Sequence, residues 1–152
     1  CSVYAHPCHT VLPIPFEVAG RKIAVVSDED VRKTRPSPPP FLWIVDITDE
    51  KHPIPVSTYQ IEGLENINMP EFTGCHQPAE QVYSTEIPVA WFAHGLRVVD
   101  IKNPHAPKEV AYFVPDTPQG FDRPQTNDVF LTREGHMYVI DRNKGMHILE
   151  RT

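Results

Sequence analysis

Two histidines occupy matching positions where they could carry out chemistry. Cys8-His9 and Cys75-His76 are the same dipeptide in two parts of the chain, and each precedes a stretch with strand-forming residues. Imidazole nitrogens that converge from two such positions can bind a first-row transition metal, and iron, copper, zinc and manganese are all compatible with them. We therefore predict a metal site at His9 and His76. The alternative is that both histidines only stabilise the fold through hydrogen bonds to a neighbouring backbone.

Other side chains could complete such a site. His6 lies three residues before His9, and Asp128 stands where a third copy of the pattern would begin. The turn at Ser27–Asp30 carries three carboxylates that could join a metal site or bind calcium, although acidic turns of this kind commonly face solvent only. His94 is expected in a turn of the second unit, on the side away from the metal site.

Conventional catalytic motifs are absent from the sequence. There is no glycine-rich phosphate loop, no G-x-S-x-G and no H-E-x-x-H. Both Cys8 and Cys75 adjoin a histidine, but neighbouring strand residues point to opposite faces, so a Cys–His dyad is not expected. The three cysteines form no C-x-x-C motif, and a Cys8–Cys75 disulfide and two free thiols both remain open.

The segments that must position these residues form a repeat. Leu42–Ile47 (LWIVDI) returns 54 residues later as Leu96–Ile101 (LRVVDI), and Met146–Glu150 is a weaker third copy. The aspartates of the first two copies, Asp46 and Asp100, each precede a proline by seven residues. A carboxylate at the end of a strand can accept backbone N–H groups from its own turn, so we predict a structural role for both.

Each copy is the third strand of a four-stranded unit about 50 residues long, which is the pattern of β-propeller blades. The 17 prolines also leave little room for helices. We predict an all-β fold: one propeller segment over 1–152, an incomplete ring with blades at about 8–61, 75–114 and 126–151, of which the third lacks its outer strand. The other expected strands are Thr10–Ile14, Ile23–Ser27, Val56–Ile61, Glu80–Ser84, Val89–Ala93, Glu109–Val114, Asp128–Thr132 and Met137–Asp141.

The Leu42–Ile47 and Leu96–Ile101 strands, with their shared aspartate-to-proline spacing, resemble the LVIVD-repeat family of β-propeller proteins. The resemblance extends over residues 8 to 151 and implies a scaffold more than a chemistry. It also implies a secreted, periplasmic or cell-surface location. Propellers close with about 4–8 blades, so closure requires self-association or the remaining blades of a longer chain. The start at Cys1, without a methionine, favours a piece of a longer protein.

Composition narrows the function. The net charge of −6 argues against a nucleic-acid partner, and no apolar run approaches the roughly 20 residues of a membrane span. Two functions remain open. We favour a binding module for a protein or carbohydrate partner, because the scaffold is clear and a standard catalytic signature is absent; the alternative is a metal-dependent enzyme, an oxidoreductase or a hydrolase, with a histidine-lined site at the central channel.

Overall fold

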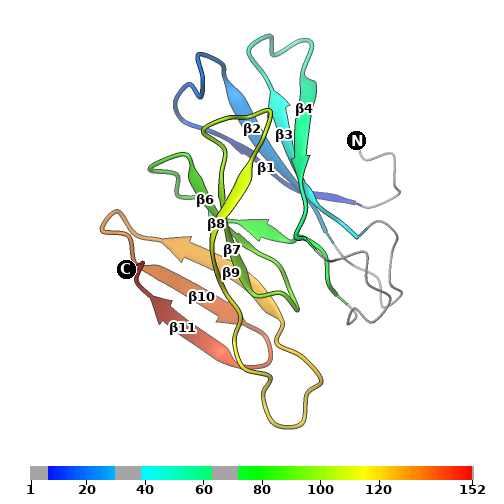
Figure 1. The fold of residues 1–152 in the computed structure, drawn as a ribbon, viewed down its shortest axis with the longest axis vertical. Helices are drawn as coiled ribbons and strands as arrows, with labels where there is room; N and C mark the ends of the chain where they lie inside the picture. Colours follow the sequence, from blue (N-terminus) through cyan, green and yellow to red (C-terminus); the bar gives the residue numbers. More distant parts are fainter. Residues whose placement is uncertain (1–6, 30–38, 63–71, 152) are drawn as a thin grey trace.

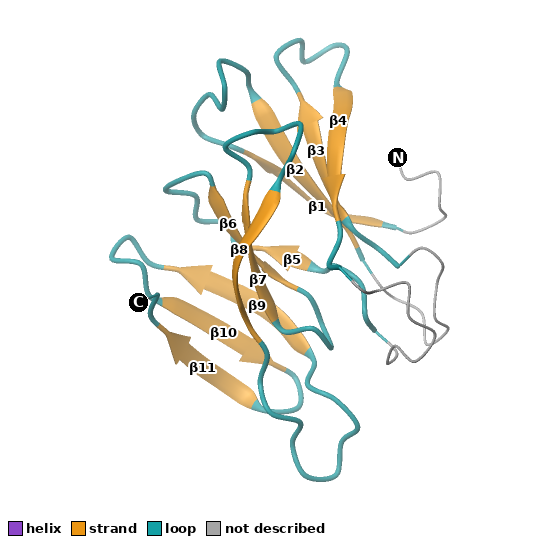
Figure 2. Ribbon diagram, in the orientation of Figure 1, coloured by secondary structure: helices purple, strands orange, loops and turns teal. Residues whose placement is uncertain are grey.

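The structure is a computed structural model that describes residues 7–29, 39–62 and 72–151. The described residues form strands, turns and loops (Figure 2), and they include no helix that is long and apolar enough to cross a membrane. The strands make three antiparallel sheets that follow one another along the chain (Figure 1).

The first sheet contains four strands in sequential order: β1 (Cys8–Pro13), β2 (Ile23–Asp28), β3 (Leu42–Asp46) and β4 (Ile54–Tyr59). The second repeats this order with β5 (Gln77–Pro78), β6 (Glu86–Ala90), β7 (Leu96–Asp100) and β8 (Lys108–Phe113). The third contains β9 (Thr126–Leu131), β10 (Met137–Asp141) and β11 (Gly145–Leu149). The predicted all-β fold, with two four-stranded blades and a third blade of three strands, is confirmed.

The blades pack face to face through alternating apolar side chains. Val25 and Ile44 of the first blade are fully buried in one cluster with Ile87 and Val99 of the second. The opposite face of the second blade packs on the third, where its residues join a second apolar cluster. Each fully buried aliphatic side chain stabilises the fold by about 1.5–3 kcal/mol relative to an exposed one. The two clusters therefore fix neighbouring blades against each other.

Strands β1 and β9 each contain a β-bulge close to their first residue. In β1, Cys8 pairs with Asp28 and Thr10 pairs with Ser27, so His9 is the extra residue. In β9, Asn127 is the extra residue in the same way. A bulge re-aims the side chain and leaves a backbone group outside the ladder, which is why bulges are common beside functional sites.

The predicted inner and second strands of the second blade were wrong in their bounds. Glu80–Ser84 is not a strand, because the ladder ends where the Ala79 N–H donates to the Pro88 carbonyl at 2.8 Å and proline has no N–H to return. The expected strand at Val89–Ala93 begins three residues earlier, at the start of β6. It ends at Ala90 because the chain then turns back through Gly95, whose φ is +74°.

The repeated aspartates hold the turns that follow their strands, as predicted. Asp46 Oδ1 accepts the Thr48 N–H at 2.9 Å, and Asp100 Oδ1 accepts the Lys102 N–H at the same distance. Hydrogen bonds from Thr48, followed by the nearby Arg21 guanidinium, lower the pKa of Asp46. Both carboxylates therefore act as turn acceptors.

Candidate metal centre

Three side chains converge at the junction of the first two blades. Ligand atoms of His9, Glu29 and His76 all lie within 4.8 Å of one another. One Glu29 oxygen, Oε2, is 3.7 Å from His9 Nε2, and the other, Oε1, is 3.4 Å from His76 Nε2. The two imidazole ring centroids are 4.5 Å apart. The structure thus brings the predicted histidine pair together and adds a carboxylate to it.

Local backbone structure positions each of the three residues. His9 occupies the bulge of β1. Glu29 follows β2 directly, and its N–H donates to the Pro7 carbonyl at 2.9 Å, which holds it beside the start of β1. His76 precedes β5, and its N–H donates to the Ala90 carbonyl of β6 at 3.1 Å. The first blade therefore supplies one imidazole and the carboxylate, and the second blade supplies the other imidazole.

The backbone of the third blade sets the tautomer of His76. Nδ1 of His76 is 2.5 Å from the Asn127 carbonyl, and since a carbonyl only accepts, Nδ1 carries the proton. That carbonyl belongs to the bulge residue of β9. Burial lowers the pKa of His76, so its imidazole is neutral at neutral pH. Nε2 of His76 therefore presents a lone pair to Glu29, and a hydrogen bond of this kind typically orients metal-binding histidines.

A hydrogen-bonded chain between the first two blades sets the tautomer of His9. The Thr10 hydroxyl donates its single proton to the Gln77 side-chain oxygen at 2.7 Å. His9 Nδ1 lies 2.9 Å from the same hydroxyl oxygen and must therefore be the donor in that contact. In its neutral form, with Nδ1 as donor, His9 presents the lone pair of Nε2 to Glu29.

Two imidazole nitrogens and a carboxylate thus lie close together. A carboxylate and the lone pair of a neutral imidazole repel each other unless a proton or a metal ion lies between them. Ligand atoms about 2.1 Å from a tetrahedral metal are separated by roughly 3.4 Å, close to the 3.4 and 3.7 Å that separate Glu29 from the two histidines. The side chains are 33% (His9), 21% (Glu29) and 7% (His76) exposed. An ion held here would be accessible from the His9 side.

Aromatic packing covers the other side of His76. The Phe92 ring lies 4.6 Å from the His76 ring, and the Arg142 guanidinium lies over Phe92 at 5.7 Å. When the blades are aligned through the strand pairs β2–β3 and β6–β7, Phe92 takes the position that Glu29 has in the first blade. The same position of the repeat therefore carries a carboxylate in the first blade and an aromatic ring in the second.

Among the described residues, none of the other sequence candidates joins this cluster. His6 and Asp30 are outside the described residues. Asp128 is an exposed residue of β9 and is not among the clustered ligands. His94 lies in the turn between β6 and β7, as expected, and its Nε2 contacts the Thr73 hydroxyl. Sequence reasoning named the acidic turn that contains Glu29 as able to join a metal site but did not single out Glu29 within it.

Cys8 and Cys75 do not take part in the cluster. Cys8 is exposed, Cys75 is buried, and both are free thiols. Burial raises the pKa of Cys75 well above its usual value, so its sulfur remains protonated at neutral pH. The disulfide that the sequence left open between these two residues is absent.

Comparison with protein families gives a match to part of the chain. Residues 88–113 match the family model of the LVIVD repeat. The matched segment runs from within β6 to the end of β8 and includes the Leu96–Ile101 copy. No curated protein matches the chain. The chain therefore carries an LVIVD repeat within a series of antiparallel, propeller-like blades.

Proposed function

We propose that this chain is a metal-binding propeller segment. His9, Glu29 and His76 hold one divalent first-row transition ion at the junction of the first two blades. The observation that supports this proposal is the convergence of ligand atoms from His9, Glu29 and His76, all within 4.8 Å of one another. Two imidazoles and a carboxylate suit zinc, iron and manganese, and copper also accepts imidazole ligands.

Three protein ligands leave at least one coordination position for water or a substrate, which is the arrangement of catalytic metal sites. The partial exposure of His9 gives that position a route to solvent. We therefore favour a metal-dependent activity, hydrolytic or redox, over a module that only binds a protein or carbohydrate partner. The donor set is assembled from two blades and has its tautomers set by further hydrogen bonds, more than a binding scaffold requires.

The test is metal binding by the purified chain. After treatment with a chelator and its removal, the protein is titrated by calorimetry with Zn²⁺, Mn²⁺, Cu²⁺ and, without oxygen, Fe²⁺; elemental analysis gives the stoichiometry. We expect one equivalent of at least one of these ions. His9→Ala removes a partly exposed ligand and should weaken binding by more than about 100-fold, beyond the 10–100-fold typical of outer-shell changes.

His52→Ala is the matched control, because the His52 side chain is 78% exposed and pairs with the carboxylate of Asp49 in its own turn. Binding by this variant should equal that of the parent. If the parent binds none of the four ions, or if a folded His9→Ala variant binds as tightly as the control, the proposal fails.

A further inference from the structure

A polar groove lies between the fourth strands of the first two blades. It has a volume of about 740 Å³ and is lined by the end of β4, the residues that follow it and the start of β8, with Arg97 of β7 in its wall. A volume of this size is typical of small-molecule sites. None of His9, Glu29 and His76 lines the groove. It is therefore separate from the candidate metal centre.

A phenol, a carboxylate and a guanidinium are fixed to one another in this groove. The Tyr59 hydroxyl donates to Glu109 Oε2 at 2.5 Å, and Arg97 Nη1 donates to Oε1 of the same carboxylate at 3.3 Å. Arg97 Nε donates to the His94 carbonyl at 3.0 Å. Burial, and then the hydrogen bond to Glu109, raise the pKa of Tyr59, so its hydroxyl keeps the proton that it donates. The three polar groups are thus held in a defined arrangement.

The next blade interface has aromatic rings at the corresponding positions. By strand register, Phe113 has the position of Tyr59, and His147 has that of Arg97. The Phe113 and His147 rings lie 5.2 Å apart. Blade packing thus does not by itself require a phenol and a guanidinium at these positions. A buried ion pair is also a weak source of stability, because desolvation of the charges offsets their attraction. The polar groups of the groove are therefore better explained by ligand binding than by packing.

The charges that line the groove indicate a neutral, hydroxyl-rich ligand. Arg97 and Lys108 are basic and Glu62 and Glu109 are acidic, so the formal charges of the lining residues balance. Recognition of a strongly charged ligand requires an excess of the opposite charge. A carboxylate accepts hydrogen bonds from hydroxyl groups, and a guanidinium has a third nitrogen beyond Nε and Nη1 that can donate to them. Neighbouring hydroxyls of one ligand can therefore bind to Glu109 and Arg97 together.

Tyr112 provides a flat apolar surface next to these polar groups. It is the cross-strand partner of Arg97, whose guanidinium lies over the Tyr112 ring at 5.0 Å. Tyr112 is 67% exposed, although its ring offers a large apolar area. The C–H face of a sugar ring packs well on such a surface while adjacent polar side chains bind its hydroxyl groups.

We propose that this groove binds an uncharged carbohydrate. Glu109 accepts hydrogen bonds from the sugar hydroxyls, Arg97 donates to them, and the Tyr112 ring packs against a sugar ring. The site is formed within one interface by β4, β7 and β8 and does not use the metal ligands. Carbohydrate binding here is therefore independent of the proposed metal-dependent activity.

The test measures binding of tetrasaccharides to the whole 152-residue chain by calorimetry, with a chelator present so that the metal centre does not contribute. The probes are the uncharged tetramers of α-linked glucose, β-linked glucose, mannose and N-acetylglucosamine. Tetragalacturonate, which carries a carboxylate on each sugar, is the anionic comparison. We expect saturable binding of at least one uncharged probe and weaker binding of tetragalacturonate.

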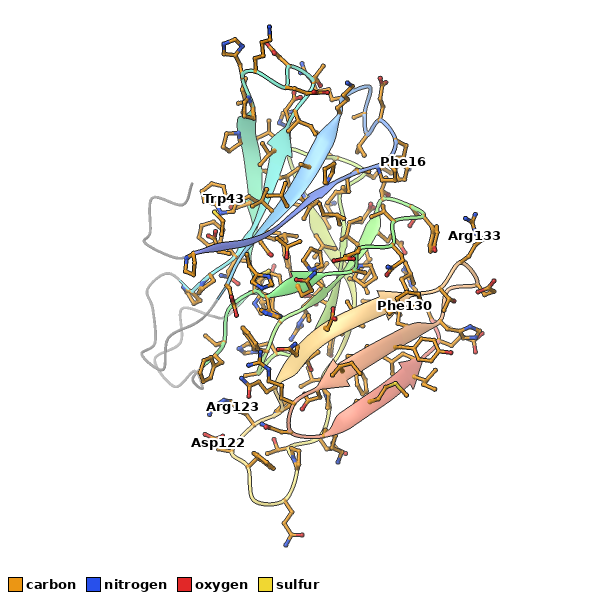
Figure 3. All side chains as sticks on the ribbon, turned by 180° about the vertical axis from the view of Figure 1, so that it is seen from behind. Phe16, Trp43, Asp122, Arg123, Phe130 and Arg133 are labelled. Atoms are coloured by element: carbon orange, nitrogen blue, oxygen red, sulfur yellow. The ribbon has the colours of Figure 1, made fainter. Side chains whose placement is uncertain are left out.

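Two variants test the residues. Tyr112→Ala removes the exposed ring, and Glu109→Gln keeps the side-chain shape but removes the charged acceptor. Each should weaken binding of the best probe by about 10-fold or more. Tyr83→Ala is the matched control, because Tyr83 is also an exposed tyrosine with an arginine over its ring, Arg133 at 5.1 Å. Arg133 lies in the turn after β9 (Figure 3), and neither residue lines the groove.

The Tyr83→Ala variant should bind the probe as the parent does. The proposal is overturned if none of the uncharged probes binds, if tetragalacturonate binds more tightly than all of them, or if folded Tyr112→Ala binds as tightly as the control. Near-UV circular dichroism and urea unfolding check that each variant is folded. Tyr112 is exposed, so its variant gives a decisive result even if Glu109→Gln does not fold.

Discussion

Replacing Glu29 with glutamine separates a metal-ligand role from an ion-pair role. In the structure the Glu29 oxygens lie 3.4 Å from His76 Nε2 and 3.7 Å from His9 Nε2, and a metal-ligand role requires both nitrogens to be unprotonated. A glutamine has the same shape but offers N–H groups, so it can donate to one of these nitrogens. A hydrogen bond of this kind contributes about 0.5–1.5 kcal/mol. We therefore expect metal-free Glu29→Gln to be about 1 kcal/mol more stable than the parent.

Metal should reverse this order. An ion that binds only the folded parent stabilises it by about 2.7 kcal/mol at a free concentration of 100 Kd. For a chain of this length, 1 kcal/mol corresponds to a shift of roughly 2–4 °C in Tm. The parent should therefore gain about 5–11 °C with metal, whereas the Glu29→Gln variant should gain little because it lacks the anionic ligand.

The assay is urea and thermal unfolding at pH 7.5, with a chelator in one series and the bound metal in the other. Glu50→Gln is the matched control, because Glu50 is 74% exposed and pairs with Lys22 at 3.1 Å in the surface turns. It should change the stability by less than about 0.5 kcal/mol and keep the full metal response. A metal-free Glu29→Gln variant that is less stable than the parent would refute the reasoning, since Glu29 would then be paired with a protonated histidine.

Three further predictions concern the scaffold. Burial lowers the pKa of His94 to about 4, so folding favours its neutral form. The free energy of unfolding should therefore be highest above about pH 6.5 and fall by up to about 3 kcal/mol as the pH drops towards 4. Urea unfolding across this range should show a shallower decline for His94→Gln, and equal slopes for the two proteins would contradict the assignment. Gly95→Ala should lower the free energy of unfolding by at least about 2 kcal/mol more than Gly135→Ala. Both residues have positive φ, but only at Gly95 would the new Cβ lie 2.1 Å from a backbone carbonyl oxygen of β8. Equal losses in denaturant unfolding would show that this close approach relaxes. In the native chain the exposed Cys8 should react with a thiol reagent much faster than the buried Cys75. In urea both thiols should react at comparable rates. Fast labelling of Cys75 in the native chain would contradict its burial.

The sequence alone determined the fold class and the number of strands in each blade. Leu42–Ile47 and its copy Leu96–Ile101 place apolar side chains on both faces of their strands. The spacing between the two copies indicates a repeated unit rather than one continuous sheet. The turn role of Asp46 and Asp100 was also predictable, because an aspartate at a strand end bonds to residues only two positions away. Interactions over such short distances along the chain can be read directly from the amino-acid order.

The tertiary structure decided where β5 ends and which residues form the candidate site. A local pattern cannot show that the partner of Ala79 is Pro88, which ends the ladder. Equally, the repeat predicted that His9 and His76 are equivalent but not that Glu29 lies between them. Two bulges, the packing of one blade on the next and a backbone carbonyl of the third blade bring these atoms together and fix their tautomers. Such contacts join residues far apart in the chain, so they depend on how the sheets stack and not on the composition of any one segment.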